Sequence, residues 1–458
     1  MPKDFVLSCV RSGRRVDRAE FRQDVERSLC KLRELRTGAG DRVIVSVNDP
    51  LKCLTTLFAV WQMGCCAVMV NPAITDLERA TVTKATGARL LVSDDAVQQM
   101  HGSGMRQFGP REAALILMTS GTTGVPKGVT HSFATLHARL AANLAEIGAA
   151  SLDRTFCTLP LFFGHGLIGN ALTALYAGKH LSLMPKMQLD EIGRFGETLD
   201  DLGITFFSSV PSFWRMVLMA SPKPKHPPQR VHIGSAPLSK ELWNKVSDWC
   251  GTTNVHNTYG MTETANWISG GALHDDRSAD GYVGRPWGGQ FKVWREGRLR
   301  DTGAGEIAVK TPGQMIGFWG QPDQTAAVLR GDYMMTGDLG VLEADQTLRL
   351  VGRTKNEINV AGIKVLAEEV DMLLERHPSV LEACSFGIPD PIAGERVGAV
   401  VRLSDDTVDA AALIAWCREQ ARPDAIPAKV EITKDIPKND RGKISRRDIQ
   451  RMMVAKWA

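Results

Sequence analysis

Short apolar runs alternate with longer amphipathic runs along most of the first 350 residues, and this alternation constrains the fold more than any other feature. The run at 131–149 is typical of a helix, because Leu136, Leu140 and Leu144 fall on one stripe of a helical surface. Strands that alternate with helices form mostly parallel sheets with helices on both faces. We therefore predict an α/β fold. The runs expected to form strands are 43–47, 90–92, 115–118, 180–184, 205–209 and 230–233.

The sequence changes in character near residue 300, where glycines begin to interrupt short apolar runs. This pattern indicates a small β-rich subdomain. After residue 355 the chain returns to a mixture of helix-like and strand-like runs, which is typical of an α+β domain. Because 458 residues exceed what one ordinary core holds, we predict a large N-terminal domain of residues 1–354 and a small C-terminal domain of residues 355–458.

Composition argues against several classes of protein. Lys and Arg number 55 against 51 Asp and Glu, a net charge of +4, so nucleic acid is not expected as a main partner. The nine cysteines form no CxxC pair or Cys/His cluster, which is typical of reduced thiols in a cytoplasmic protein without a structural metal. Residues 53–70 carry no charge, but Gln62 and Gly64 interrupt them, so a buried helix and a short strand at 67–70 fit better than a membrane span.

A loop rich in glycine and hydroxyl groups, TSGTTGVPKGVTH (119–131), follows the apolar run at 114–118. Glycines let its backbone turn tightly and direct N–H groups at an anion. Lys127 adds a positive charge, and a helix expected to begin near His131 would add its positive end. A P-loop NTPase is disfavoured, because no Ser or Thr follows Lys127 to hold a magnesium ion. The predicted phosphate ligands are Thr119, Ser120, Gly121, Thr122, Thr123, Gly124 and Lys127.

This loop resembles the phosphate-loop signature of the adenylate-forming enzymes, which comprise acyl-CoA synthetases, adenylation domains of peptide synthetases and luciferases. Four further segments resemble motifs of the family in the family's order: NTYGMTET (257–264), YMMTGDLG (333–340), GRTKNEINVAGIKV (352–365) and PKNDRGK (437–443). The likeness covers nearly the whole chain and is strongest to aryl- and acyl-CoA ligases. It implies ATP, Mg²⁺ and CoA as cofactors, and a mobile C-terminal domain that carries the catalytic lysine.

The resemblance implies roles for residues around the nucleotide. Thr262 would donate to the α-phosphate and Glu263 would help to hold Mg²⁺, since a hard cation prefers carboxylate and phosphate oxygens. Asp338 would accept from both ribose hydroxyls, and Arg353 would contact ribose or phosphate. The alternative for this pair is a plain salt bridge between domains. The residues implied to line the adenine are Gly234, Ser235, Ala236, Asn257, Tyr259 and Gly260.

The C-terminal motifs imply a catalytic cation and a hinge. Lys443 would stabilise the negative charge that develops when a carboxylate attacks the α-phosphorus; in isolation it reads as an ordinary surface lysine. Lys355 stands at the family's hinge position, where backbone rotation would move Lys443 away before a thiol arrives. Gly362 would face the tunnel of that thiol. The alternative for Lys355 is a solvated linker charge.

The segment LPLFFGHGLIGNAL (159–172) resembles the acid-pocket segment of benzoate-type and other aryl-CoA ligases. The predicted substrate residues are Phe163, His165, Phe207 and Met261. A structural role for His165 and core packing for Phe207 and Met261 are open alternatives. Residues 159–175 contain no acidic side chain. A buried substrate ammonium would lack a partner there, so an α-amino acid is not expected as the substrate.

These observations predict an AMP-forming carboxylate–CoA ligase for an aromatic or other apolar acid. One alternative is a standalone adenylation enzyme that loads the phosphopantetheine arm of an acyl carrier protein, which the basic C-terminal tail would dock. A nucleotide-binding regulator without chemistry is a second alternative, against which Lys127, Glu263, Asp338 and Lys443 all argue. The expected partners are therefore a small carboxylic acid, ATP and CoA.

Overall fold

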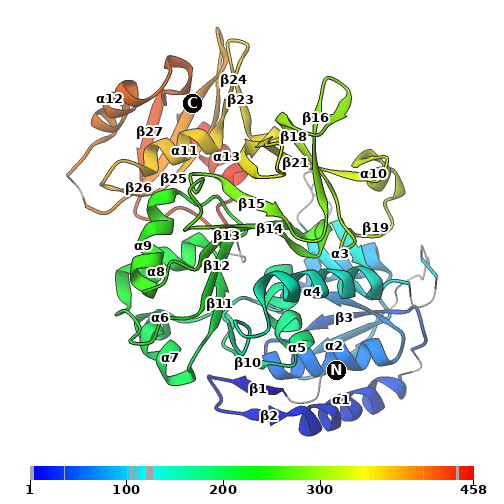
Figure 1. Cartoon of the computed structure of the whole chain (residues 1–458). Helices are drawn as coiled ribbons and strands as arrows, with labels where there is room; N and C mark the ends of the chain where they lie inside the picture. The colour runs from blue at the N-terminus through cyan, green and yellow to red at the C-terminus, as the bar shows by residue number, and fades with distance from the viewer. Residues whose placement is uncertain are drawn as a thin grey trace.

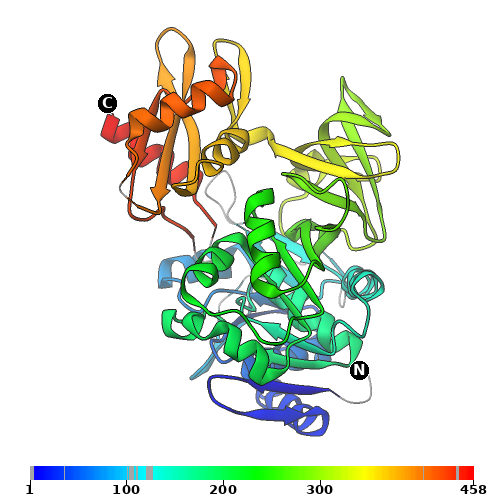
Figure 2. The same ribbon diagram turned by 60° about the vertical axis from the view of Figure 1, so that its left-hand side comes forward.

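The computed structural model describes residues 5–35, 37–100, 102, 108–109, 112–119, 127–405, 407–439 and 443–457. It contains three sheets with helices packed against them (Figure 1). Two sheets form a large N-terminal body, and the third forms a smaller C-terminal unit on top of it (Figure 2). This arrangement confirms the predicted α/β class with a large first domain and a small α+β second domain.

The first sheet has seven strands, of which the inner four are parallel. Its buried strands are short and rich in Val, Ile and Leu, as expected for a parallel sheet covered on both faces. Its spatial order is β19 (Gly317–Phe318), β8 (Lys127–His131), β7 (Leu115–Thr119), β4 (Cys66–Met69), β3 (Arg42–Ser46), β5 (Leu90–Ser93) and β6 (Val97–Gln99).

The second sheet has 15 strands and joins the predicted β-rich subdomain to a second parallel region. The run from β13 to β1 is parallel and the remainder is antiparallel. Its order is β17 (Arg298–Arg300), β16 (Gln290–Arg295), β18 (Gly303–Lys310), β21 (Tyr333–Leu342), β22 (Leu348–Arg353), β15 (Tyr282–Pro286), β14 (Asn266–Ala272), β13 (Val255–Met261), β12 (Arg230–Gly234), β11 (Phe206–Ser209), β9 (Arg154–Cys157), β10 (His180–Leu183), β1 (Val6–Cys9) and β2 (Arg15–Asp17), with β20 (Leu329–Arg330) beside β21.

The third sheet belongs to the C-terminal unit and has its own buried cluster, which includes Val370, Leu374 and Val401. The second sheet ends at Arg353 and the third begins at Glu357, so a single turn, Thr354–Asn356, connects the two. The strands are β24 (Ile363–Leu366), β23 (Glu357–Val360), β26 (Gly394–Leu403) and β25 (Val380–Asp390), with β27 (Lys429–Ile432) beside β26.

The helices begin and end at recognisable signals. Pro50 and Pro211 stand in first turns, and Gly87, Gly203 and Gly251 end helices in the left-handed conformation. The α-helices are α1 (Arg18–Arg33), α2 (Pro50–Gln62), α3 (Asp76–Thr86), α4 (Phe133–Ile147), α5 (Thr173–Ala177), α6 (Leu189–Gly193), α7 (Phe195–Leu202), α8 (Pro211–Ala220), α9 (Lys240–Cys250), α10 (Pro322–Ala327), α11 (Ala367–Glu375), α12 (Ala410–Gln420) and α13 (Arg446–Trp457), and a π-helix, η1, spans His165–Leu172.

The uncharged stretch 53–70 is the buried helix α2 followed by strand β4, as predicted. In the part of the chain that the structure describes, no helix combines the length and apolar character that crossing a bilayer requires. All nine cysteines are free, and Cys30 alone among them is exposed.

The helix expected near His131 begins at Phe133, because Ser132 caps it by accepting from the N–H of Thr135. The prediction did not include the strand that precedes this helix. The preceding residues, Lys127–His131, form strand β8, which pairs antiparallel with β7. The loop therefore connects two strands of a hairpin, and a five-residue strand separates it from the positive end of α4.

Candidate active site

The phosphate loop begins and ends at a defined point of the first sheet. Thr119 ends β7 opposite Lys127, which begins β8, and the Thr119 hydroxyl donates to the Lys127 carbonyl at 3.4 Å. The Lys127 ammonium lies 5.0 Å from the centre of the Phe318 ring. The predicted ligands Ser120, Gly121, Thr122, Thr123 and Gly124 lie outside the described residues. Thr119 and Lys127 thus fix where the loop leaves and rejoins the sheet.

The segment after β13 is held from two sides. His131 Nε2 lies 2.8 Å from the Thr262 carbonyl, and the Glu263 carbonyl accepts from the N–H of Met315 at 2.7 Å. The Glu263 side chain is half-buried. Burial raises its pKa, and the positive charges of Arg353 and Lys127 act in the opposite direction. The negative charge of Asp338 adds to the rise, so Glu263 is a partly desolvated carboxylate with charges of both signs nearby.

Glycine is required where two strands approach closely beside this segment. A Cβ at Gly260 would lie 2.1 Å from the Asn266 carbonyl, and one at Gly234 would lie 2.5 Å from the Thr258 hydroxyl. Ser235 follows Gly234 in the left-handed conformation, with φ of 68°. The residues predicted to line the adenine therefore lie on two neighbouring strands, β12 and β13, or directly after β12: Gly234, Ser235, Ala236, Asn257, Tyr259 and Gly260.

Asp338 is the centre of a buried polar cluster. It is 3 % exposed and accepts from the Tyr259 hydroxyl at 2.6 Å and from Arg353 Nε at 2.6 Å. Asp338 and Arg353 are opposite each other on β21 and β22, so their ion pair lies within the second sheet and does not connect two domains. Burial and the charge of Asp338 raise the pKa of Tyr259, which stays a neutral donor.

Lys443 reaches this site from the far end of the chain. Its ammonium lies 5.7 Å from the centre of the Phe163 ring, and its charge acts on His165. Phe163 is buried directly before η1, and His165 begins that helix. The C-terminal unit and the segment predicted to line the acid pocket therefore meet at one point.

His165 joins three elements of the N-terminal domain. Its Nε2 lies 2.7 Å from Ser208 Oγ on β11, and its Nδ1 lies 2.9 Å from Ser235 Oγ after β12. Burial, together with the charge of Lys443, lowers the pKa of His165 to about 3. The imidazole is therefore neutral at physiological pH. The sequence alone did not identify Ser208 as its partner, because nothing in an apolar strand marks which serine faces the site.

The remaining substrate residues differ in their surroundings. Phe207 is fully buried among aromatic side chains, 5.5 Å from the Trp214 ring and 4.9 Å from the Phe195 ring. Successive strand residues point to opposite faces of a sheet, so Phe207 points away from the face on which Ser208 contacts His165. Phe207 is therefore core, in agreement with the packing alternative. Met261 is half-buried at the end of β13, next to Thr262.

Lys355 and Gly362 lie at the edge of the C-terminal unit. Lys355 is in the turn between the second and third sheets. Gly362 is exposed in the turn between β23 and β24, with φ of 89°, and an added Cβ there would have no neighbour within 4 Å. This hairpin points away from the N-terminal body (Figures 1 and 2). In this arrangement Lys443 faces the site and Gly362 does not.

The residues fit a nucleotide with a divalent cation. The described residues hold no cluster of three or more His, Cys, Asp or Glu able to bind a metal ion. Mg²⁺ commonly needs only one or two carboxylates, because phosphate oxygens and water complete its coordination. Glu263 supplies a carboxylate whose charge is poorly solvated, which a cation would compensate. Lys127, Arg353 and Lys443 supply positive charge for a polyanion.

Comparison with known proteins defines the enzyme class, a ligase that activates a carboxylate with ATP. The family model of the AMP-binding enzymes matches residues 2–319, and that of the AMP-binding enzyme C-terminal domain matches residues 369–443. The chain belongs to the AMP-binding enzyme family. It is an AMP-forming carboxylate–CoA ligase that uses ATP to make an acyl-adenylate and then transfers the acyl group to the thiol of CoA.

Curated relatives agree with this assignment, and a solved structure shares the fold. The chain is 31% identical over 360 residues to an oxalate–CoA ligase of Arabidopsis thaliana, and the match covers 76% of this chain and 69% of the relative. It is 27% identical over 438 residues to a 2-succinylbenzoate–CoA ligase of Geobacillus kaustophilus, covering 90% and 88%. It shares the fold of an o-succinylbenzoate coenzyme A synthetase from Bacillus subtilis, solved with ATP and a magnesium ion, with a TM-score of 0.84, 23% identity and coverage of 97% and 96%.

Proposed function

We propose that Lys443, Thr262 and Glu263 are the catalytic residues of the ligase and that Lys443 acts in adenylation only. A carboxylate oxygen attacks the α-phosphorus, the bond from that phosphorus to the pyrophosphate oxygen breaks, and an acyl-adenylate forms. Negative charge grows on the α-phosphate oxygens during this step, and a fixed ammonium stabilises it more than it stabilises the bound substrates. The observation that carries the proposal is the approach of Lys443 to Phe163 and His165.

The nucleotide would lie between the phosphate loop and Asp338. Each oxygen of Asp338 keeps acceptor capacity beside its bonds to Tyr259 and Arg353, so the ribose hydroxyls have acceptors. Thr262 would donate to the α-phosphate. Glu263 would hold Mg²⁺ together with phosphate oxygens, and the ion would neutralise charge on the triphosphate.

The acid is proposed to be aromatic or otherwise apolar, because the ammonium of Lys443 approaches the apolar ring of Phe163. One observation favours a second candidate, a small acid with an additional polar group. His165 and its partners Ser208 and Ser235 place hydrogen-bonding groups beside the same point. The relatives named for oxalate and 2-succinylbenzoate act on acids with a second carboxylate.

The acceptor is CoA, and an acyl carrier protein is the alternative partner. The nine free thiols support a cytoplasmic location. We propose that the arrangement in which Gly362 faces outward is the one used for adenylation, and that a rotation at Lys355 brings the β23–β24 turn to the thiol's path before transfer. Residues 1–354 and 355–458 would then move as two domains.

Pyrophosphate release across a panel of acids tests the proposal. The panel contains benzoates, cinnamates, short and medium fatty acids, oxalate, malonate and α-amino acids, and free CoA is compared with a holo-carrier protein. We expect acid-dependent release with an aromatic or a small polar acid, and faster turnover with CoA. Activation of α-amino acids, or no acid-dependent pyrophosphate release with any of these acids, would contradict the proposed substrate class.

A further inference from the structure

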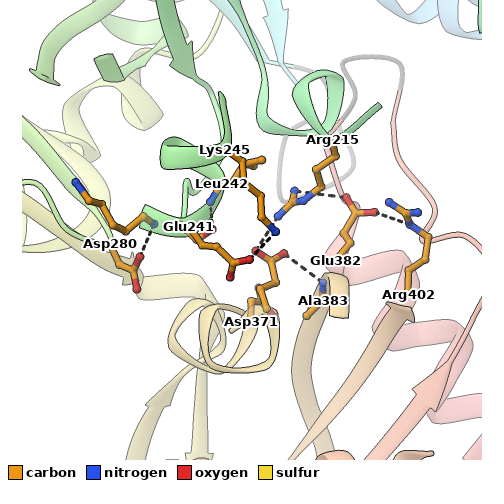
Figure 3. A network of polar contacts seen from close by, with 12 residues as sticks. Arg215, Glu241, Leu242, Lys245, Asp280, Asp371, Glu382, Ala383 and Arg402 are labelled. Atoms are coloured by element: carbon orange, nitrogen blue, oxygen red, sulfur yellow. Dashed lines mark hydrogen bonds and ion pairs between the residues drawn. The ribbon is translucent and has the colours of Figure 1, made fainter. Parts of the chain in front are cut away.

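Helix α8 carries one charged side chain, Arg215, within an otherwise uncharged sequence, PSFWRMVLMA. Its side chain is only 15 % exposed, and it points out of the N-terminal domain toward the C-terminal unit (Figure 3). The helix follows β11 directly, and Ser208 on β11 contacts His165. One strand and helix therefore contact the acid-pocket segment at one end and the C-terminal domain at the other.

Arg215 meets two buried carboxylates of the C-terminal domain. Its Nη2 lies 2.7 Å from Glu375 Oε2 at the end of α11, and its Nη1 lies 3.9 Å from Glu382 Oε1 on β25. Side chains of Glu375 and Glu382 are 13 % and 1 % exposed. Few ions in proteins are buried so fully without close partners, because desolvation is costly. The two buried carboxylates therefore depend on close cationic partners, and Arg215 supplies one across the interface.

Glu382 continues the network to the segment that carries Lys443. Its carboxylate lies 3.0 Å from Lys438 Nζ and 3.7 Å from Arg402 Nε; Figure 3 shows Glu382 between Arg215 and Arg402. Lys438 forms a β-bridge with Ile444. The N–H of Asn439 donates to the Lys443 carbonyl at 2.8 Å, and the N–H of Lys443 donates to Asn439 Oδ1 at 3.1 Å.

We propose that Arg215 is a positioning residue for adenylation, which seats the C-terminal domain through Glu375 and Glu382 so that Lys443 reaches the reacting groups. The inference rests on the proposed role of Lys443. Arg215 touches neither the acid nor the nucleotide. It stabilises the arrangement in which Lys443 lies over Phe163, and the second half-reaction does not require that arrangement.

A second ion pair across the same interface supplies a matched control. Arg376 on the C-terminal side lies 2.8 Å from Asp280, but its side chain is 61 % exposed. Exposed pairs contribute little because water solvates both partners. Removal of Arg215 leaves the buried carboxylate of Glu375 without its ion-pair partner, while Glu382 keeps Lys438 and Arg402. Removal of Arg376 leaves the carboxylate of Asp280, which water can reach.

The experiment measures both half-reactions in Arg215→Gln, Arg215→Lys, Arg376→Gln and the double variant Arg215→Gln/Glu375→Gln. Adenylation is followed by acid-dependent ATP–pyrophosphate exchange, and thioester formation starts from preformed acyl-adenylate and CoA. In Arg215→Gln we expect exchange to fall about tenfold or more, while thioester formation stays within about threefold of wild type. Arg376→Gln should stay within about twofold in both assays.

The charge on Glu375 supplies a readout that a general packing defect would not change. Burial raises the pKa of Glu375 to about 7, and the charge of Arg215 opposes that rise; Asp371, Glu382 and the N–H of Ala383 also face it. Removal of Arg215 raises the pKa of Glu375 further, because the charge of Arg215 no longer opposes the effect of burial. As the pH falls, Glu375 takes up a proton, and the neutral carboxyl needs no cation beside it. The exchange defect of Arg215→Gln should therefore be larger at pH 8.5 than at pH 6. The double variant should recover part of the lost exchange at pH 8.5.

The outcomes separate this inference from the proposed function. If wild type shows no acid-dependent exchange, the role of Lys443 fails and the inference falls with it. If wild type exchanges but Arg215→Gln loses both half-reactions equally, or neither, Arg215 does not position Lys443. Should Arg215→Gln fail to fold, Arg215→Lys, which keeps the charge, decides the question. A loss of exchange larger than its loss of thioester formation would support the positioning role, and equal losses would contradict it.

Discussion

At the scale of single residues, His165 shows how the site holds a neutral imidazole next to a cation. Both ring nitrogens contact serine hydroxyls, and burial with Lys443 lowers its pKa to about 3, against an ordinary value of 6.5. A group whose pKa is depressed by folding stabilises the protein above its unfolded pKa, and that stability is lost as pH falls. Each pH unit below 6.5 then costs up to about 1.4 kcal/mol, until pH 3 is reached.

We therefore predict that the free energy of unfolding falls between pH 6.5 and pH 4 and that His165→Gln makes this fall shallower. Urea denaturation at a series of pH values measures the slope. Ser208→Ala is the control, because it removes one hydrogen bond and leaves the imidazole in place. A wild-type slope retained in His165→Gln would show that His165 does not stay neutral.

At the scale of elements, the π-helix η1 is packed directly against the backbone that precedes it. A Cβ at Gly166 would lie 2.3 Å from the Pro160 carbonyl and 2.8 Å from the Leu159 carbonyl, and neither backbone atom can move aside easily. Because η1 begins with His165, a shift of this helix moves the imidazole with it.

Gly166→Ala should therefore destabilise the protein by about 1–3 kcal/mol and raise the KM for the acid. Chemical denaturation and initial rates measure the two effects. Gly38→Ala is the control, because an added Cβ there has no neighbour within 4 Å. Equal stability of the two variants would mean that η1 does not rely on this close approach.

At the scale of the whole molecule, the structure presents Lys443 to the site and holds Gly362 away from it. A side chain at position 362 should block thiol transfer and leave adenylation intact. We predict that Gly362→Leu keeps pyrophosphate exchange within about threefold and lowers the rate of thioester formation by about 10²-fold or more. A loss of this size is typical when a reacting group is held out of position.

Gly394→Leu controls for backbone strain in this test. Gly394, the first residue of β26 in the same sheet, also has a positive φ, 78°, and its added Cβ would meet only the Asn359 carbonyl, at 3.8 Å. A loss of thioester formation in both variants would point to strain in the C-terminal domain, and would remove Gly362 from the thiol's path.

Much of this architecture follows from local pattern. The strands at 90–92 and 230–233 lie within one residue of their predicted ends, because continuous apolar runs between turn residues leave few alternatives. The hairpin strand β8 was missed, since Val129 and Thr130 are compatible with either a strand or a helix entrance. Arg215, Glu375 and Glu382 were missed as well. Their roles depend on contacts between segments far apart in the chain, which periodicity does not encode.

The measurement that most directly tests the account is acid-dependent ATP–pyrophosphate exchange in Lys443→Ala, set beside thioester formation from preformed acyl-adenylate. We predict that exchange falls about 10²-fold or more, as for the loss of one preorganised transition-state donor, while thioester formation stays close to wild type. If exchange remains near the wild-type rate, the claim that Lys443 and the phosphate loop act on the same nucleotide is wrong.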